Sequence, residues 1–506
     1  MNAISGDRQT WTVPTVVRRV RPLGEILAPP RARYFAHIPL LLAFTGILVW
    51  ITASEYSTVV GSIVGGAVGC YMLYDWLVQE GETRYSTTLA VGLLLGYCLG
   101  AFNTWATTSR GGFTLGQFLG YDDAVLARGM AAVLLSCANT IFFGELFERP
   151  LFGRDFRIWA DRRIYSFIYV GTMVLVGAVA SGALGFSGDV AGQNGHVGVV
   201  KTFIIWMFAP LIAVAVTLFL DTPGLGVRKI LIGTSVLILF ILMVIMGRRN
   251  MVYTSMETIF LARISGFRLR GSIRKKLLFF IPLGAFVVLG ALSFMLLRVA
   301  GYTGNPKAHK SLGERLSIAY QWVNEGTAWD KAVSSTQSNV EVRTFVLGFF
   351  ANVLEGSSTH TPGLGRDTFG LLQLAVPSAL YPEKDKYFSE EALTDKLYGF
   401  TYKDEANSVL TNGATDFGLL GAMFFPLAVA WVLRVLTEFA VWRLNQFAIL
   451  MMVLANLYSC IQAENSIAAL TDAVFYGLIF SVAVVILFSI PRFQLRNDFS
   501  PGSSVG

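Results

Sequence analysis

The feature that most constrains this chain is a series of long apolar runs without charged residues. Residues 230–246 and 277–297 are two clear examples, and each approaches the roughly 20 apolar residues that cross a bilayer core. These runs do not alternate between apolar and polar residues, as the strands of a membrane barrel do. Only 14% of all residues are charged, against roughly a quarter in soluble domains. The sequence therefore predicts an all-α polytopic membrane protein.

Counted at that length, the apolar runs give about twelve transmembrane helices. The predicted spans are 35–53, 57–78, 86–104, 124–145, 164–186, 199–220, 230–246, 250–264, 277–299, 412–433, 446–462 and 472–490. More than half of the 40 Lys and Arg then fall on cytoplasmic segments, as the positive-inside rule requires. The eighth span is short and polar. Omitting it would place the cationic cluster at 263–276 outside, so we retain it.

This threading divides the chain into five parts and places both termini in the cytoplasm. The parts are a cytoplasmic N-terminal segment (1–34), the first nine helices (35–299), one large structured periplasmic loop with short interfacial helices (300–411), the last three helices (412–490) and a cytoplasmic tail (491–506). The N-terminal segment lacks the pattern of a signal peptide. Cys70, Cys98, Cys137 and Cys460 lie in or beside apolar runs, and we expect them to be core residues.

The large loop is not uniformly polar. It contains the charged stretch "ALYPEKDKYF" at 379–388, but residues 342–356 and 369–382 are mostly apolar and too short to span. Irregular backbone cannot face lipid, so these stretches are expected either to lie on the outer bilayer surface or to dip into the bundle. Pro362, Gly363 and Gly365 break the chain between them. A loop that folds back in this way would form a lid or cavity wall.

Cationic groups outside the cytoplasmic segments are candidates for anion binding. Arg248 and Arg249 end the seventh predicted span on the outer side, against the positive-inside trend. They either extend to the interface or form an anion clamp, because the planar arginine fork binds phosphate oxygens bidentately. Arg343, Arg366 and Lys384 lie in the large loop, where a solvated surface charge is the simpler interpretation. Arg343 differs, because it opens an apolar stretch and needs a partner.

A polar stripe leads into the tenth predicted span. Its members recur at helical spacing, so they share helix faces that must contact protein or water rather than lipid. They include Asn407, Ser408, Thr411, Asn412 and Asp416. Such a stripe either joins helices through hydrogen bonds or lines a polar cavity suited to sugars.

Three stretches carry a resemblance to a known family. They are "RTFVLGFFANVLEGSSTHTPGLGRDTF" (343–369), "PSALYPEKDKY" (377–387) and "NSVLTNGATDFGLLG" (407–421). The shorter stretch "GRRN" at 247–250, after a middle span, adds to the resemblance. In this order, and with one large outer loop, the chain resembles the bacterial oligosaccharide repeat-unit polymerases, the Wzy or O-antigen polymerase family of GT-C-like membrane glycosyltransferases. The related O-antigen ligases usually have His-Asn where this chain has Ala406-Asn407. That difference favours a polymerase.

The resemblance implies an enzyme of the bacterial inner membrane that joins oligosaccharide units carried on undecaprenyl diphosphate, in O-antigen, capsule or exopolysaccharide synthesis. Arg248, Arg249, Arg343, Arg366 and Lys384 would bind the diphosphate, and the polar stripe would bind saccharide. The residues that would take the acceptor proton are Glu405, His360 and Asp404. Glu405 is preferred slightly, because it lies beside the polar helix.

The expected partners are the lipid-linked oligosaccharide, membrane lipids, a chain-length-determining membrane protein and a flippase. No metal, cofactor or nucleic acid is expected. Three alternatives stay open: a transporter or flippase of lipid-linked saccharides, an O-antigen ligase-like transferase, and a non-enzymatic scaffold of an export complex. A transporter of this size would be expected to show two similar halves, and the sequence shows no such repeat.

Overall fold

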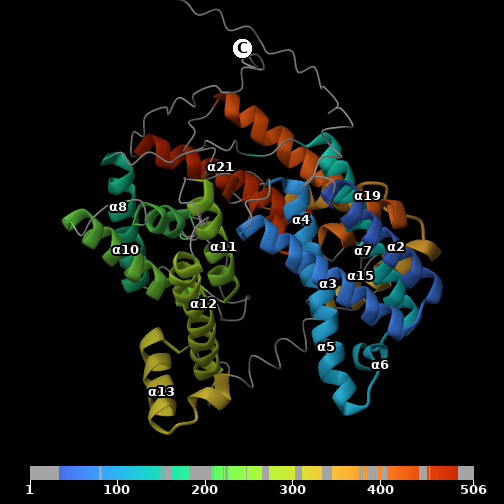
Figure 1. Ribbon diagram of the computed structural model, residues 1–506, viewed down its shortest axis with the longest axis horizontal. Coiled ribbons are helices and arrows are strands. Elements are labelled where there is room, and N and C mark those ends of the chain that lie inside the picture. The colour runs from blue at the N-terminus through green and yellow to red at the C-terminus, as the bar shows by residue number, and fades with distance from the viewer. Residues whose placement is uncertain are drawn as a thin grey trace, which may run out of the picture.

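The fold is taken from a computed structural model of the chain. It describes residues 33–78, 83–148, 151, 162–181, 208, 210–219, 222, 226–246, 248–264, 273–302, 310–332, 345–374, 376, 381, 383, 394, 397–399, 407–443, 453–454, 456–457 and 459–487. Every regular element in this part of the chain is a helix (Figure 1). The predicted all-α class is confirmed to that extent.

The described residues form a series of helices along the chain. Their bounds are η1 (Arg33–His37), α2 (Ile38–Thr52), α3 (Glu55–Val78), α4 (Tyr85–Leu93), η2 (Leu94–Leu99), α5 (Gly100–Thr108), η3 (Ser109–Gly111), α6 (Leu115–Leu119), α7 (Asp123–Phe147), α8 (Arg162–Ala180), α10 (Val227–Met243), η4 (Val244–Met246), α11 (Arg248–Ile264), α12 (Ile273–Tyr302), α13 (Leu312–Asn324), α15 (Phe345–Thr359), α16 (Arg366–Leu374), α19 (Val409–Arg443) and α21 (Ile467–Leu487).

Five helical stretches of the described residues are long and apolar enough to cross a membrane. They are Glu55–Trp76, Tyr85–Gly111, Asp123–Phe147, Phe280–Gly301 and Val409–Phe439. Shorter apolar helices occupy Ile38–Thr52, Ile164–Ala180, Pro210–Phe219 and Ile467–Ile479. These helices support a membrane protein, whereas the twelve spans and the periplasmic position of the large loop stay predictions.

Helix α7 forms the centre of the larger group of helices, on the right of Figure 1. It packs against α2, α3, α4, α15 and α19. Small buried residues such as Ala127, Ala131 and Ala138 let these neighbours approach closely, as is typical of membrane helix interfaces. A second group contains α8, α10, α11 and α12, and α11 contacts α3.

Helix α15 lies inside the larger group, although it belongs to the segment predicted as an outer loop. Phe349, Phe350 and Val353 are fully buried, and the helix packs against α7 and α19. The Phe350 ring meets the ring of Tyr97 edge-to-face, with centroids 5.8 Å apart. Of the two positions expected for the apolar stretch at 342–356, burial within the bundle is therefore the one observed.

A buried charged cluster holds α4 against the end of α7. Arg84 is 2% exposed and forms an ion pair with Glu145. The carboxylate of Glu148 accepts hydrogen bonds from the backbone N–H groups of Tyr85 (2.7 Å) and Ser86 (2.9 Å) at the N-terminus of α4. Arg84 therefore has a structural role as an ion-pair partner.

The prediction for the cysteines is correct at three positions and wrong at one. Cys98, Cys137 and Cys460 are buried with free thiols, whereas Cys70 is exposed on α3. An apolar run in a membrane protein has a face that meets lipid, and hydropathy alone does not separate that face from the core.

Candidate functional site

The predicted polar stripe forms a buried group of side chains at the start of α19, which we call the polar hub. Its members are each at most 2% exposed: Asn407, Ser408, Thr411, Asn412, Thr415 and Asp416. Immediately afterwards, α19 breaks at Gly418, whose φ of 62° and ψ of −145° are not helical. Beyond this break, Gly421 packs directly on the backbone of Gly413, so the two parts of α19 fold against each other.

Asp416 binds the N-terminal turn of α16. Its Oδ1 accepts the backbone N–H of Asp367 at 2.9 Å, and its Oδ2 accepts the backbone N–H (2.9 Å) and hydroxyl (2.6 Å) of Thr368. A helix N-terminus carries unpaired N–H groups and partial positive charge, which a carboxylate stabilises. Backbone bonds from Gly363 to Thr415 (2.9 Å) and from Leu364 to Asp416 (2.8 Å) complete the junction.

Asn412 performs the corresponding role for α21. Its Oδ1 accepts the backbone N–H of Ile467, the first residue of α21, at 3.0 Å. Its Nδ2 donates to Oδ2 of Asp367 at 2.9 Å and to Oδ1 of Asn407 at 3.4 Å. The short first part of α19 thus connects the N-termini of α16 and α21, which are far apart in the sequence.

Tyr97 joins the hub to the helix formed by α4, η2 and α5. The Tyr97 and Ser408 hydroxyls lie 2.6 Å apart, and the Ser408 hydroxyl is 3.1 Å from that of Thr411. Tyr97 lies in η2, a π-helical turn inside this predicted span. Such turns interrupt regular helices and often occur at functional sites. At about 1.5 Å per residue, Tyr97 lies roughly 18 Å along its helix from Tyr85, which places this contact deep in the bundle.

Tyr398 and His360 lie beside the hub. The Tyr398 hydroxyl donates to the carbonyl of Thr415 at 3.4 Å, and its ring meets that of His360 edge-to-face at 5.7 Å. Burial, together with the negative charges of Asp367 and Asp416, raises the pKa of Tyr398 to about 12. The His360 side chain is exposed.

The His360 ring is held in place locally. Its Nδ1 is 2.9 Å from the Thr359 hydroxyl and 3.1 Å from the carbonyl of Gly356. The ring is therefore fixed at the C-terminal end of α15 while its other edge stays available to a ligand.

Arg366 is the first residue of α16, and its side chain is exposed. Its backbone N–H donates to the carbonyl of Gly363 at 3.2 Å, within a turn in which Leu364 (φ 53°) and Gly365 (φ 88°) are left-handed. His360 and Arg366 therefore occupy the two ends of one turn, and Asp416 fixes that turn to the hub.

The structure brings some predicted residues together and leaves others untested. Asn407, Ser408, Thr411, Asn412 and Asp416 lie together in the hub, and His360 and Arg366 lie at the two ends of the turn that Asp416 binds. Arg248 and Arg249 start α11 in the second group of helices, and their side chains are not described. Arg343, Lys384, Asp404 and Glu405 lie outside the described residues.

Sequence reasoning missed three members of the site: Asp367, Tyr97 and Tyr398. Asp367 is 2% exposed and directly follows the predicted Arg366. An Asp in the first turn of a short apolar helix was a pattern that could have indicated it. Tyr97 and Tyr398 resemble ordinary core or loop aromatics, and their contacts join residues far apart in the sequence.

The two parts of the site differ in what they can do chemically. Asp416 is buried and accepts three hydrogen bonds, so it is suited to positioning the turn rather than to taking a proton from a ligand. His360 and Arg366 are exposed and carry groups that can accept a proton or bind an anion. Within the described residues, no group of three His, Cys, Asp or Glu side chains could hold a metal ion.

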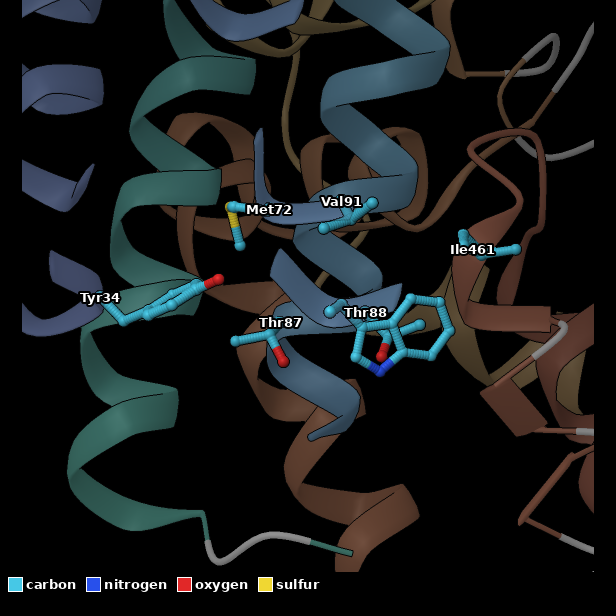
Figure 2. Close-up of a pocket in the computed structure, with 7 residues that line it drawn as sticks. Tyr34, Met72, Thr87, Thr88, Val91 and Ile461 are labelled. Carbon is cyan, nitrogen blue, oxygen red and sulfur yellow. The ribbon is translucent and has the colours of Figure 1, made fainter. Parts of the chain in front are cut away.

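A small cavity lies elsewhere in the bundle (Figure 2). It is lined by Tyr34, Met72, Trp76, Thr87, Thr88, Val91 and Ile461. The hydroxyls of Thr87 and Thr88 donate to the carbonyl of Arg84, at 3.1 and 2.8 Å, and the indole N–H of Trp76 donates to Thr83 at 2.9 Å. Its polar groups are thus engaged within the protein, and none of the predicted site residues lines it.

Comparisons of the chain with protein-family models, curated proteins and solved structures find no match.

Proposed function

We propose that this protein is a membrane glycosyltransferase that polymerises oligosaccharide units carried on undecaprenyl diphosphate, at the periplasmic face of a bacterial inner membrane. The observation that supports it best is the turn between α15 and α16. This turn belongs to the largest segment between predicted spans, presents an exposed arginine and an exposed histidine, and is fixed to a buried polar hub by Asp416.

The proposed reaction needs positioning and charge stabilisation more than redox or metal chemistry. The bond between the reducing-end sugar and its lipid diphosphate breaks, and a glycosidic bond to a hydroxyl of the next unit forms. The acceptor hydroxyl loses its proton to a side chain or to the departing diphosphate, and undecaprenyl diphosphate leaves. Preorganised cations stabilise the charge that develops on the leaving group.

Residue roles follow from exposure and chemistry. Arg366 is assigned to the diphosphate, because its planar fork is exposed beside the hub. His360 is assigned to the acceptor proton as one of three candidates, with Asp404 and Glu405. The remaining candidates for the diphosphate are Arg248, Arg249, Arg343 and Lys384. The hub supports the turn, and its role in binding saccharide stays a prediction.

The decisive experiment incubates purified protein with an undecaprenyl-diphosphate-linked repeat unit and separates the products by size. A ladder of longer chains on the lipid supports the proposal, and unchanged substrate at normal protein quality contradicts it. Variants of His360, Asp404 and Glu405 to Ala, and to Gln or Asn, belong in the same assay. A side-chain base typically contributes about 10²–10⁴-fold to the rate. If activity fell about tenfold or less at all three positions, none of these side chains would be the base.

A transporter of lipid-linked saccharides is the second candidate, and one observation favours it. Helix α19 is broken at Gly418 inside a candidate span, and Asn412 meets the N-terminus of α21 beside the break. Transporters build substrate sites from such broken helices and helix ends. Proteoliposomes that move a labelled lipid-linked saccharide between leaflets, without lengthening it, would establish this alternative over the polymerase.

A further inference from the structure

Helix α13 is a well-defined helix outside the candidate spans. It starts with a capping box, in which the Ser311 backbone N–H donates to Glu314 Oε2 at 2.7 Å and the Glu314 N–H donates to the Ser311 hydroxyl at 3.3 Å. It ends at Asn324, and the chain turns away at Gly326, whose φ is 70°, while the Thr327 N–H donates to the carbonyl of Trp322 at 3.0 Å. Both ends are thus specified locally.

Two cationic residues fasten α13 to the C-terminal end of α12. Lys310 Nζ donates to the carbonyl of Ala300 at 3.2 Å, and Arg315 Nε donates to the carbonyl of Lys310 at 3.0 Å. The Arg315 side chain is 3% exposed and packs directly on Gly301. Positive charge is favourable at a helix C-terminus. The candidate span of α12 also ends at Gly301. Helix α13 therefore begins beside the end of that span, near the lower end of α12 in Figure 1.

The surface of α13 divides into three sectors at helical periodicity. Arg315, Ala319 and Trp322 are buried, and α13 packs against α12. The opposite sector is polar and includes Ser317, Gln321 and Asn324, all exposed. Between them lies an exposed apolar sector: Leu316, Tyr320 and Val323 are 53%, 68% and 58% exposed.

We infer that α13 is a membrane-surface helix and that its sector of Leu316, Tyr320 and Val323 inserts into the lipid bilayer beside the end of α12. This sector is adjacent to the one packed on a candidate membrane span, so it meets the boundary between headgroups and acyl chains. Exposed Trp329 (63%) follows the helix, and tyrosine and tryptophan are enriched at this boundary. The polar sector then faces water, as in other interfacial helices.

This arrangement is independent of the proposed polymerase activity. It gives the segment after α12 a fixed attachment to the bilayer before the chain folds back as α15. Lipid is favoured over a second protein copy because the apolar sector is narrow and because α13 packs against α12, whose residues Phe280–Gly301 are a candidate membrane span. Val288 and Leu289 of α12 are themselves 57% and 63% exposed, as residues in contact with lipid would be.

The test uses the full-length protein in lipid nanodiscs, with Cys70→Ser to remove the exposed thiol. Leu316→Cys, Tyr320→Cys and Val323→Cys are each labelled with the environment-sensitive fluorophore NBD, and Gln321→Cys is the matched control on the polar sector. Phospholipids with a doxyl quencher at a shallow or a deep acyl position are then included. Interfacial helices insert about 5–10 Å, so we expect blue-shifted emission and strong quenching, greater with the shallow quencher, at 316, 320 and 323 but weak quenching at 321.

Equal, weak quenching at all four positions would overturn the inference. Blue-shifted emission without lipid quenching, together with disulfide cross-linking between copies through position 320, would overturn it in favour of a dimer contact. All four positions are exposed, so the substitutions leave the core intact, and a monodisperse size-exclusion profile of each labelled protein verifies this.

Discussion

At the residue scale, Asp416 and Arg366 show how this site separates support from chemistry. Asp416 is buried and fully hydrogen-bonded, and it satisfies N–H groups that α16 cannot satisfy itself. Arg366 starts the same helix but points its guanidinium outward. The carboxylate offsets the partial positive charge of the helix end, so the arginine supplies the positive charge that remains available to a ligand.

Replacing Arg366 with lysine tests this division. The variant keeps the charge but loses the planar fork, so we expect polymer formation to fall strongly, by about tenfold or more for the loss of a bidentate contact of about 1.5–3 kcal/mol. Arg110→Lys is the control, because Arg110 is also exposed but lies outside the site. Equal activity of both variants in the ladder assay would remove Arg366 from diphosphate binding.

Asp416→Ala is expected to destabilise the fold. The variant leaves the N-terminus of α16 without its cap, and caps are worth about 0.5–2 kcal/mol. We expect a lower Tm in detergent and faster hydrogen exchange at the amides of Asp367 and Thr368. Glu438→Ala is the matched control, because that carboxylate is 51% exposed in a surface ion pair with Arg434, worth about 0–1 kcal/mol. A Tm equal to that of the control would show that the cap is dispensable.

Tyr398 gives a prediction about pH. Its folded pKa of about 12 lies above the ordinary tyrosine pKa of 10.0, so the neutral phenol stabilises the fold fully below pH 10. The unfolded chain loses this proton first as pH rises, and the stabilisation disappears between about pH 10 and 12. Between pH 9.5 and 11.5 we therefore expect the Tm of the wild-type protein to fall more steeply than that of Tyr398→Phe. Parallel curves would contradict the raised pKa.

At the element scale, the break in α19 creates the hub. A straight helix from 409 to 443 would carry Asn412 and Asp416 away from α21 and α16. The break at Gly418 instead folds the first part of α19 back, and Gly421 packs on the Gly413 backbone without room for a side chain. Glycine at these positions is therefore required by the backbone path, and the two caps depend on it.

Gly418→Ala should destabilise the protein through its backbone alone. A side chain at φ 62° and ψ −145° is strained by about 1–3 kcal/mol, whereas the nearest atom to an added methyl is at 3.6 Å, an ordinary contact. We expect a lower Tm. Gly284→Ala in α12 is the control with the opposite sign, because nothing lies within 4 Å and alanine is favoured in helices by about 1 kcal/mol. If both variants lowered the Tm equally, the strain argument would be wrong.

Helical periodicity predicted the composition of the hub but not its shape. The residues from Asn407 to Asp416 fall on shared helix faces, so their burial together followed from spacing. The break at Gly418 did not follow, because glycine is common in membrane helices and the close approach to Gly413 is a tertiary feature. The position of Tyr398 could not be predicted from the sequence either, because its contacts with His360 and Thr415 depend on the path of the chain around the hub.

At the scale of the whole molecule, contacts between residues near the helix ends pair those ends. At one end, Glu55 accepts the Leu115 N–H at 3.0 Å, and Arg128 pairs with Glu355 at 2.8 Å. At the other end, the hydroxyls of Tyr85 and Thr437 are 2.8 Å apart. Charge counting predicts which end is cytoplasmic, whereas the contacts determine which segments share an end.

Single-cysteine labelling tests both which end of the molecule is cytoplasmic and which segments share an end. In the Cys70→Ser background, Phe113→Cys and Asn324→Cys should react with a membrane-impermeant maleimide from the periplasm, because α6 and α13 lie at the same end (Figure 1). Glu438→Cys should react from the cytoplasm. Labelling of 113 and 324 from opposite sides would contradict the fold, and labelling of both from the cytoplasm would contradict the predicted orientation and the proposed periplasmic reaction.

The paired caps also have a consequence for biosynthesis. Helix α16 has nine residues, too few to be stable in isolation, and its cap at Asp416 is made after it on the ribosome. The cap of α21 comes from Asn412, which emerges before it. The segment containing α15 and α16 must therefore wait, unfinished, until the tenth predicted span enters the membrane. Insertion of that one broken helix would then supply both caps, so this part of the fold is completed only late in synthesis.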